Sequence, residues 1–158
     1  MPTMCTLRPV SPEDMSFLER VYASTRVEEL SVTDWSDAQK AAFIRQQFTA
    51  QDAHYRKHYP TSQYFVIEAG DSPIGRLYVD RWIREIRIMD IALLPERRGE
   101  GIGTRLINDL QEEAQATGKS LSIHVEKFNP ALRLYDRLGF KPVEDKDVYL
   151  LMEWKAPE

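Results

Sequence analysis

The stretch that decides the fold is Arg98-Gly99-Glu100-Gly101-Ile102-Gly103-Thr104. It follows an apolar run at residues 91–95 and leads into a helical pattern over residues 102–114. The order strand, glycine-rich turn, helix places a row of backbone N–H groups at the positive end of a helix, where a phosphate or pyrophosphate can bind. The stretch therefore predicts that the chain binds a phosphorylated cofactor.

The part of the chain before this turn predicts two helices among four strands. Ser11 followed by Pro12 marks the start of a helix that we expect to run to about Glu29. Ser36 and Gln39 form the capping-box pattern of a second helix, which ends ahead of a proline at position 60. Strand-like runs occur at residues 6–10, 64–67, 74–79 and 86–94.

After the turn the pattern predicts a helix closed by Gly118, a strand over 121–125, a short helix over 131–138 and two last strands. Two strand–helix units inside an otherwise antiparallel meander favour a mixed sheet with helices packed on it. We therefore expect an α/β (α+β mixed) fold, with a mostly antiparallel sheet of about seven strands and four helices. No linker or repeat is visible, so residues 1–158 are predicted to form a single domain.

Composition is that of an ordinary globular domain, with 42% hydrophobic and 29% charged residues. The net charge of −4 argues against a general surface for nucleic acid or anionic membranes. The single cysteine, Cys5, supports no internal disulfide and suits a reducing compartment. The chain shows neither a signal-peptide pattern nor the ~18 apolar residues of a membrane span. We expect a soluble, cytoplasmic protein.

Two common phosphate-binding loops fit the turn poorly. A Walker A loop needs a lysine after its last glycine, whereas Gly103 is followed by Thr104 and Arg105. A dinucleotide fingerprint needs the spacing G-x-G-x-x-G early in a repeated strand–helix unit, whereas this turn has G-x-G-x-G and comes late. ATP and the dinucleotides are therefore disfavoured as ligands.

A third loop fits closely. The pattern Arg-x-x-Gly-x-Gly, from Arg98 through Gly103 after a strand ending in Leu-x-Pro, resembles the acyl-CoA pyrophosphate loop of the GNAT N-acetyltransferase superfamily. A second match to that family is Asn129-Pro130-Ala131-Leu132-Arg133-Leu134-Tyr135-Asp136-Arg137-Leu138-Gly139-Phe140. The step from Asn129 to Tyr135 is one residue shorter than the family's commoner spacing. The order of elements also matches, so the resemblance implies a GNAT-like fold.

The resemblance implies an acetyl-CoA-dependent N-acetyltransferase, which moves an acetyl group directly from the CoA thioester to a primary amine. It implies a small-molecule or peptide acceptor, no metal, no nucleic acid, no membrane, and a possible homodimer. The pyrophosphate would lie on backbone N–H groups of the loop, and the pantetheine arm would pair with the preceding strand. The implied cofactor-binding residues are Ile91, Ala92, Leu93, Arg98, Gly99, Glu100, Gly101, Ile102, Gly103, Thr104 and Asn129.

The same resemblance implies that the Tyr135 hydroxyl acts as general acid for the departing thiolate. His124 interrupts an apolar strand and is a candidate base for the amine, because its ordinary pKa lies near neutrality. A histidine hydrogen-bonded at the sheet surface explains the same pattern, and water could serve as the base instead. Two other functions stay open: a non-catalytic acyl-CoA-binding module, and a nucleotide-dependent protein that ATP or NAD would stabilise more than acetyl-CoA.

Overall fold

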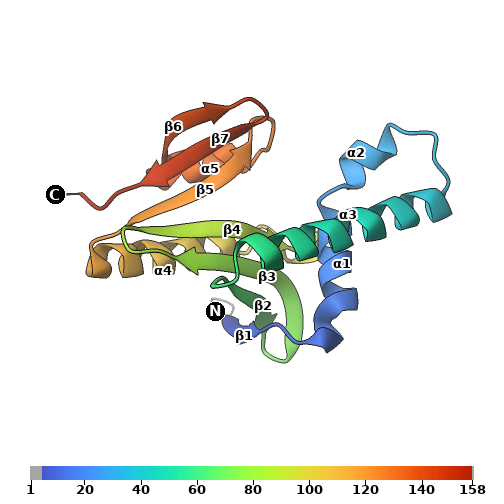
Figure 1. Ribbon diagram of the computed structural model, residues 1–158, viewed down its shortest axis with the longest axis horizontal. Coiled ribbons are helices and arrows are strands. Elements are labelled where there is room, and N and C mark those ends of the chain that lie inside the picture. Colours follow the sequence, from blue (N-terminus) through green and yellow to red (C-terminus); the bar gives the residue numbers. More distant parts are fainter. Residues whose placement is uncertain (1–4, 158) are drawn as a thin grey trace. The chain divides into compact units, whose positions relative to one another are not determined.

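Seven strands and five α-helices occur among residues 5–157, the part of the chain that the computed structural model describes (Figure 1). The strands are β1 (Cys5–Pro9), β2 (Gln63–Ala69), β3 (Ser72–Arg81), β4 (Glu85–Leu93), β5 (Ser120–Glu126), β6 (Lys141–Lys146) and β7 (Tyr149–Trp154). The helices are α1 (Met15–Ser24), α2 (Val27–Ser31), α3 (Asp37–His58), α4 (Ile102–Thr117) and α5 (Leu132–Arg137). Two 3-10 turns, η1 (Pro12–Asp14) and η2 (Pro95–Arg97), precede α1 and the glycine-rich loop.

The strands follow the order β1-β2-β3-β4-β5-β7-β6 in one mixed sheet. β4 and β5 run parallel, whereas β1–β2, β5–β7 and β6–β7 are antiparallel pairs. The predicted mixed α/β fold, with about seven mostly antiparallel strands, is therefore confirmed.

The prediction of one long first helix, and so of four helices, is wrong. The chain leaves the helix at Thr25, whose Oγ1 donates to the Tyr22 carbonyl at 2.6 Å. The backbone N–H of Arg26 donates to Ala23 O at 3.0 Å, so the last turn tightens and stops. A threonine side chain that bonds its own backbone competes with helix continuation. The result is two helices, α1 and α2, where one was expected.

The chain divides into two compact units that interleave in sequence. Unit 1 comprises the chain up to residue 77 together with 91–100, and unit 2 comprises 78–90 together with 101–158. The single domain over 1–158 stays a prediction, and its ends, 1–4 and 158, lie outside the described residues.

In unit 1 the helices pack through an apolar cluster. α1 contributes Leu18 and Tyr22, and α3 contributes Ile44 and Phe48, each at most 6% exposed. The α3 start carries the predicted capping box: Ser36 Oγ accepts from Gln39 N at 3.1 Å, and Gln39 Oε1 accepts from Ser36 N at 2.8 Å. This reciprocal pair satisfies two N–H groups that a helix start otherwise leaves without partners.

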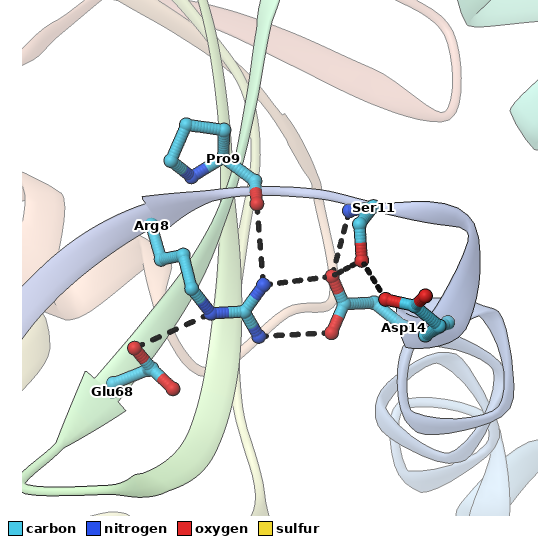
Figure 2. Close-up of polar contacts among 6 residues, drawn as sticks. Arg8, Pro9, Ser11, Asp14 and Glu68 are labelled. Atoms are coloured by element: carbon cyan, nitrogen blue, oxygen red, sulfur yellow. Dashed lines mark hydrogen bonds and ion pairs between the residues drawn. The ribbon is translucent and has the colours of Figure 1, made fainter.

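An ion-pair network joins β1 to the end of η1 in the same unit (Figure 2). The Arg8 guanidinium donates to both Asp14 carboxylate oxygens, at 2.8 and 2.9 Å, and lies 3.3 Å from Glu68. Ser11 N also donates to Asp14, at 2.7 Å. These contacts lower the pKa of Asp14 to about 2, with the Arg8 hydrogen bond as the largest cause.

In unit 2, α4 is amphipathic and buries one stripe. Its buried residues are Ile102, Leu106, Ile107, Leu110 and Ala114. Gly118 ends the helix with φ of +67°, the left-handed conformation that glycine adopts at helix ends. Burial of this stripe fixes how α4 packs within unit 2.

Candidate active site

The glycine-rich loop follows β4 and the η2 turn and leads into α4. Leu94 N donates to Ile74 O at 2.8 Å, which anchors the chain where β4 ends. Gly99 and Gly101 both have φ of +80°, a conformation that residues with a side chain rarely adopt. Gly101 is the N-cap of α4, so the first N–H groups of that helix follow the turn at once. Those groups have no partners within the helix and are suited to an anion.

Gly103 has a different environment. It lies inside α4 and is not among the positive-φ residues, so its backbone does not require glycine. A Cβ added there would meet no atom within 4 Å among the described residues. Glycine in a helix costs about 0.5–1 kcal/mol relative to alanine. Neither backbone conformation nor packing against the described residues explains a glycine at this position.

The charged side chains of the loop are held by local contacts. Arg98 Nε donates to the Leu93 carbonyl at 3.2 Å, which ties the loop back to the end of β4. Arg97 Nε donates to Glu100 at 3.0 Å. The Glu100 carboxylate is therefore neutralised locally and does not leave the loop with an unopposed negative charge.

β4 and β5 are paired over only part of their length. Their parallel register runs from Glu85 opposite Ser120 to Ile88 opposite Ile123. β4 itself continues to Leu93 and β5 to Glu126. The predicted pantetheine-binding residues Ile91, Ala92 and Leu93 therefore follow the end of the paired register; all three are half-buried.

The approach of β3 to β4 depends on a glycine that the sequence reasoning did not single out. A Cβ on Gly75 would overlap the Ala92 carbonyl oxygen and would lie 3.0 Å from Leu93 Cδ2. Only a residue without a side chain allows this backbone contact. Nothing in the local pattern of β3 signals the contact, because it depends on the pairing partner.

Tyr135 is buried in α5, at 5% exposure. Its ring meets Phe140 edge-on, with centroids 5.5 Å apart. Burial, and after it the charge of Asp90, raises the pKa of Tyr135. The phenol therefore keeps its proton at neutral pH and can act as a donor.

Asn129 shapes the loop that precedes α5. Its Oδ1 accepts from Ala131 N at 2.9 Å, and its own N–H donates to Glu126 O at 2.9 Å. The side-chain contact closes an Asx turn at the start of the helix. This local role accounts for an asparagine at position 129, and its contact with a cofactor stays a prediction.

His124 lies half-buried on β5, opposite Leu151 of β7. Burial lowers the pKa of His124, and the positive charges of Arg87 and Lys146 lower it further. Arg87 Nη1 lies 3.3 Å from His124 Nδ1. Arg87 also contacts Glu85 and Ser122, which makes a polar network on one face of β4 and β5.

The sequence reasoning missed this network, although a signal for it is present. Glu85 and Arg87 alternate with the buried Ile86 and Ile88 along β4, which indicates a polar face. The parallel register then places Arg87 opposite Ser122. Only the register shows that the polar residues of the two strands share a face.

The predicted site residues are distributed over both units. Unit 1 holds 91–93 and 98–100, and unit 2 holds 101–104 with His124, Asn129 and Tyr135. Within residues 5–157, no group of three His, Cys, Asp or Glu side chains has an arrangement that could bind a metal. Across the same residues, every helix is too short or too polar to cross a membrane.

Solved structures of acetyltransferases share this fold. The PaiA N-acetyltransferase of Thermoplasma acidophilum, solved in complex with coenzyme A, matches with a TM-score of 0.73 and 18% identity, over 97% of this chain and 99% of that one. An acetyltransferase of Thermus thermophilus matches with a TM-score of 0.71 and 19% identity, over 99% of this chain and 100% of that one.

Sequence comparison points the same way. An uncharacterized N-acetyltransferase of Methanocaldococcus jannaschii is 37% identical over 54% of this chain, and the match spans only 40% of that relative's length. The family model for the acetyltransferase (GNAT) family matches residues 25–140, which include the glycine-rich loop and the segment through Phe140. The family predicted from the two motifs is therefore confirmed: the chain belongs to the acetyltransferase (GNAT) family.

Proposed function

We propose that this protein is an acetyl-CoA-dependent N-acetyltransferase that acts on a primary amine of a small molecule or peptide. The observation that carries the proposal is Gly103, a helical glycine that neither backbone conformation nor packing explains. A pyrophosphate approaching the first turn of α4 accounts for it. Family membership and the left-handed glycines at 99 and 101 support the same ligand.

The reaction needs few groups beyond a held thioester. The amine nitrogen attacks the thioester carbonyl carbon, the C–S bond breaks, and an amide and a thiol are formed. Backbone N–H groups of 98–104 bind the pyrophosphate, and the backbone of 91–93 pairs with the pantetheine arm. The buried Tyr135 hydroxyl, which keeps its proton, donates to the departing thiolate. Two acceptors for the amine proton are open, the His124 imidazole and water.

The proposal is tested by release of free CoA thiol from acetyl-CoA with a panel of amines: spermidine, kanamycin, L-methionine and a tetrapeptide with a free amino terminus. Turnover with at least one amine is the expected result. Tight acetyl-CoA binding without turnover on any of a wide range of amines would favour the non-catalytic module. Greater thermal stabilisation by ATP or NAD than by acetyl-CoA would favour the nucleotide-dependent protein.

The role of Tyr135 is tested by Tyr135→Phe, which keeps the ring that packs on Phe140. We expect kcat to fall about 100-fold, the lower range for loss of a general acid, with the Kd for acetyl-CoA nearly unchanged. Tyr149→Phe, a matched change at a tyrosine that is 42% exposed on β7, should leave both constants unaltered. Equal losses of affinity and turnover in Tyr135→Phe would mean that Tyr135 only packs.

A further inference from the structure

The Arg87 guanidinium is held in one orientation by three neighbours. Its Nε donates to Ser122 Oγ at 2.7 Å, and its Nη2 donates to Glu85 Oε2 at 2.8 Å. Ser122 Oγ donates in turn to the same Glu85 oxygen. The Trp82 ring lies against the guanidinium, with its centroid 4.9 Å from Cζ. With 13% of the side chain exposed, the guanidinium cannot turn without breaking these contacts.

The orientation aims a further N–H of Arg87 at His124. Nη1 lies 3.3 Å from His124 Nδ1. An arginine has only donors and stays protonated in proteins. The contact is therefore a hydrogen bond only if Nδ1 carries a lone pair. In a neutral imidazole the other nitrogen, Nε2, then holds the hydrogen.

We propose that Arg87 is a positioning residue, which fixes His124 as the Nε2–H tautomer and makes it a hydrogen-bond donor to the acceptor molecule instead of the base for its amine. The catalytic part of this proposal rests on the proposed function, whereas the tautomer rests on the Arg87 geometry alone.

The same geometry opposes a base role for His124. Nε2 already carries its hydrogen, so an incoming proton would have to enter at Nδ1. Protonation there would break the bond from Arg87 and place two cations 3.3 Å apart. The protonated amine therefore loses its first proton to water before the attack. The neutral amine then attacks, the Tyr135 hydroxyl gives its proton to the departing sulfur, and the second amine proton restores the Tyr135 phenol.

The charges that shift the pKa of His124 come from β4 and β6. Glu85 and Glu144 favour its protonation, whereas Arg87, Lys146 and burial oppose it, with burial the largest effect. β7 places the apolar Leu151 directly opposite His124. The remaining polar groups of the same face, at alternate positions of β5 and β7, are Ser122, Glu126, Tyr149 and Glu153. The lowering effects prevail, so the pKa of His124 lies below its ordinary value.

The tautomer is tested by nitrogen-15 NMR of the imidazole rings in the full chain without substrate. The chain has three histidines, and loss of one signal set in His124→Gln assigns the ring of interest. At pH 7.5 we expect an unprotonated Nδ1 and a protonated Nε2. A hydrogen on Nδ1, or a doubly protonated ring, would overturn the proposal.

The role of Arg87 is tested by Arg87→Met. Without the guanidinium, the pKa of His124 should rise toward its ordinary value, because a neighbouring positive charge is lost. The matched control is Arg84→Met, which removes an exposed arginine three residues away and should leave the pKa unchanged. An unchanged pKa in a folded Arg87→Met protein would contradict the proposal. Circular dichroism and the signals of the other two histidines report folding.

Activity separates a donor from a base, measured with the panel amine that gives the highest turnover. His124→Gln keeps an N–H donor near the Nε2 position and should retain kcat/KM within about threefold. His124→Leu has no donor and should raise KM for the amine up to about tenfold, which is the range for one lost hydrogen bond. A base role predicts instead a loss of at least about 100-fold in His124→Gln. If the NMR results hold but no amine is acetylated, the proposed function fails and the tautomer assignment stands.

Discussion

Replacement of Gly103 by alanine should make the free protein more stable and weaken its binding of acetyl-CoA. The added Cβ meets no atom within 4 Å among the described residues, so no packing penalty opposes it. The helical backbone already suits alanine, which loses less conformational entropy on folding than glycine. A stabilising substitution that damages function is expected only where a ligand needs the space.

The two effects differ in sign and size. Gly103 lies in the first turn of α4, so we expect the lower part of the helical range, about 0.5 kcal/mol of added stability. For a chain of this length that corresponds to a Tm higher by about 1–2 °C. If the methyl group displaces the pyrophosphate from one backbone N–H, the lost charge-assisted hydrogen bond costs about 1.5–3 kcal/mol. The Kd for acetyl-CoA should then rise by about 10- to 150-fold.

The assays are urea unfolding of the free protein and calorimetric titration with acetyl-CoA. Gly75→Ala is the matched comparison, because the same methyl group would there overlap the Ala92 carbonyl oxygen. Overpacking of that kind costs about 1–3 kcal/mol, so Gly75→Ala should unfold at lower urea.

Two outcomes for Gly103→Ala would refute the reasoning. Unchanged acetyl-CoA affinity would show that the loop does not bind the pyrophosphate at this position. Lower stability of the free protein would show that the protein itself needs the glycine, which would remove the argument for a ligand.

Three further predictions follow from local geometry. In calorimetric titration, Gly101→Asp should bind acetyl-CoA about tenfold more weakly than Gly101→Asn. Both side chains must adopt the same positive φ, and only aspartate carries a charge that repels the pyrophosphate. Equal affinities of the two variants would argue against an anion at the loop. Asp14→Asn should lower the free energy of unfolding by about 1 kcal/mol at pH 7, allowing for a partner, Arg8, that is 38% exposed. Since the pKa of Asp14 falls from 3.8 to about 2 on folding, its contribution to the free energy of unfolding is complete above pH 3.8 and disappears as pH falls through about 2. Below that pH, urea unfolding should give the same stability for the original protein and for Asp14→Asn. Ser36→Ala should cost about 1 kcal/mol through loss of the α3 cap; a change below about 0.3 kcal/mol would mean that the cap is not formed in solution.

Local sequence signals located most of the elements. Capping residues placed the start of α3, and glycine placed the end of α4, because both act through the backbone of their immediate neighbours. The first helix was misjudged for a related reason. Thr25 stops α1 through a bond to its own backbone, and the apolar spacing on either side gives no sign of that bond.

The sequence by itself determined the family and located the glycine-rich loop, because the spacing of Arg98, Gly101 and Gly103 is read along a continuous segment. Tertiary structure alone decided what surrounds the side chains. The Arg87 contact to His124 depends on the register of β4 and β5, and the need for Gly75 depends on the backbone of β4. Pairing between distant segments sets both, and no local pattern encodes a register. The loop therefore identified the cofactor class, whereas the chemistry assigned to His124 required the neighbouring strand.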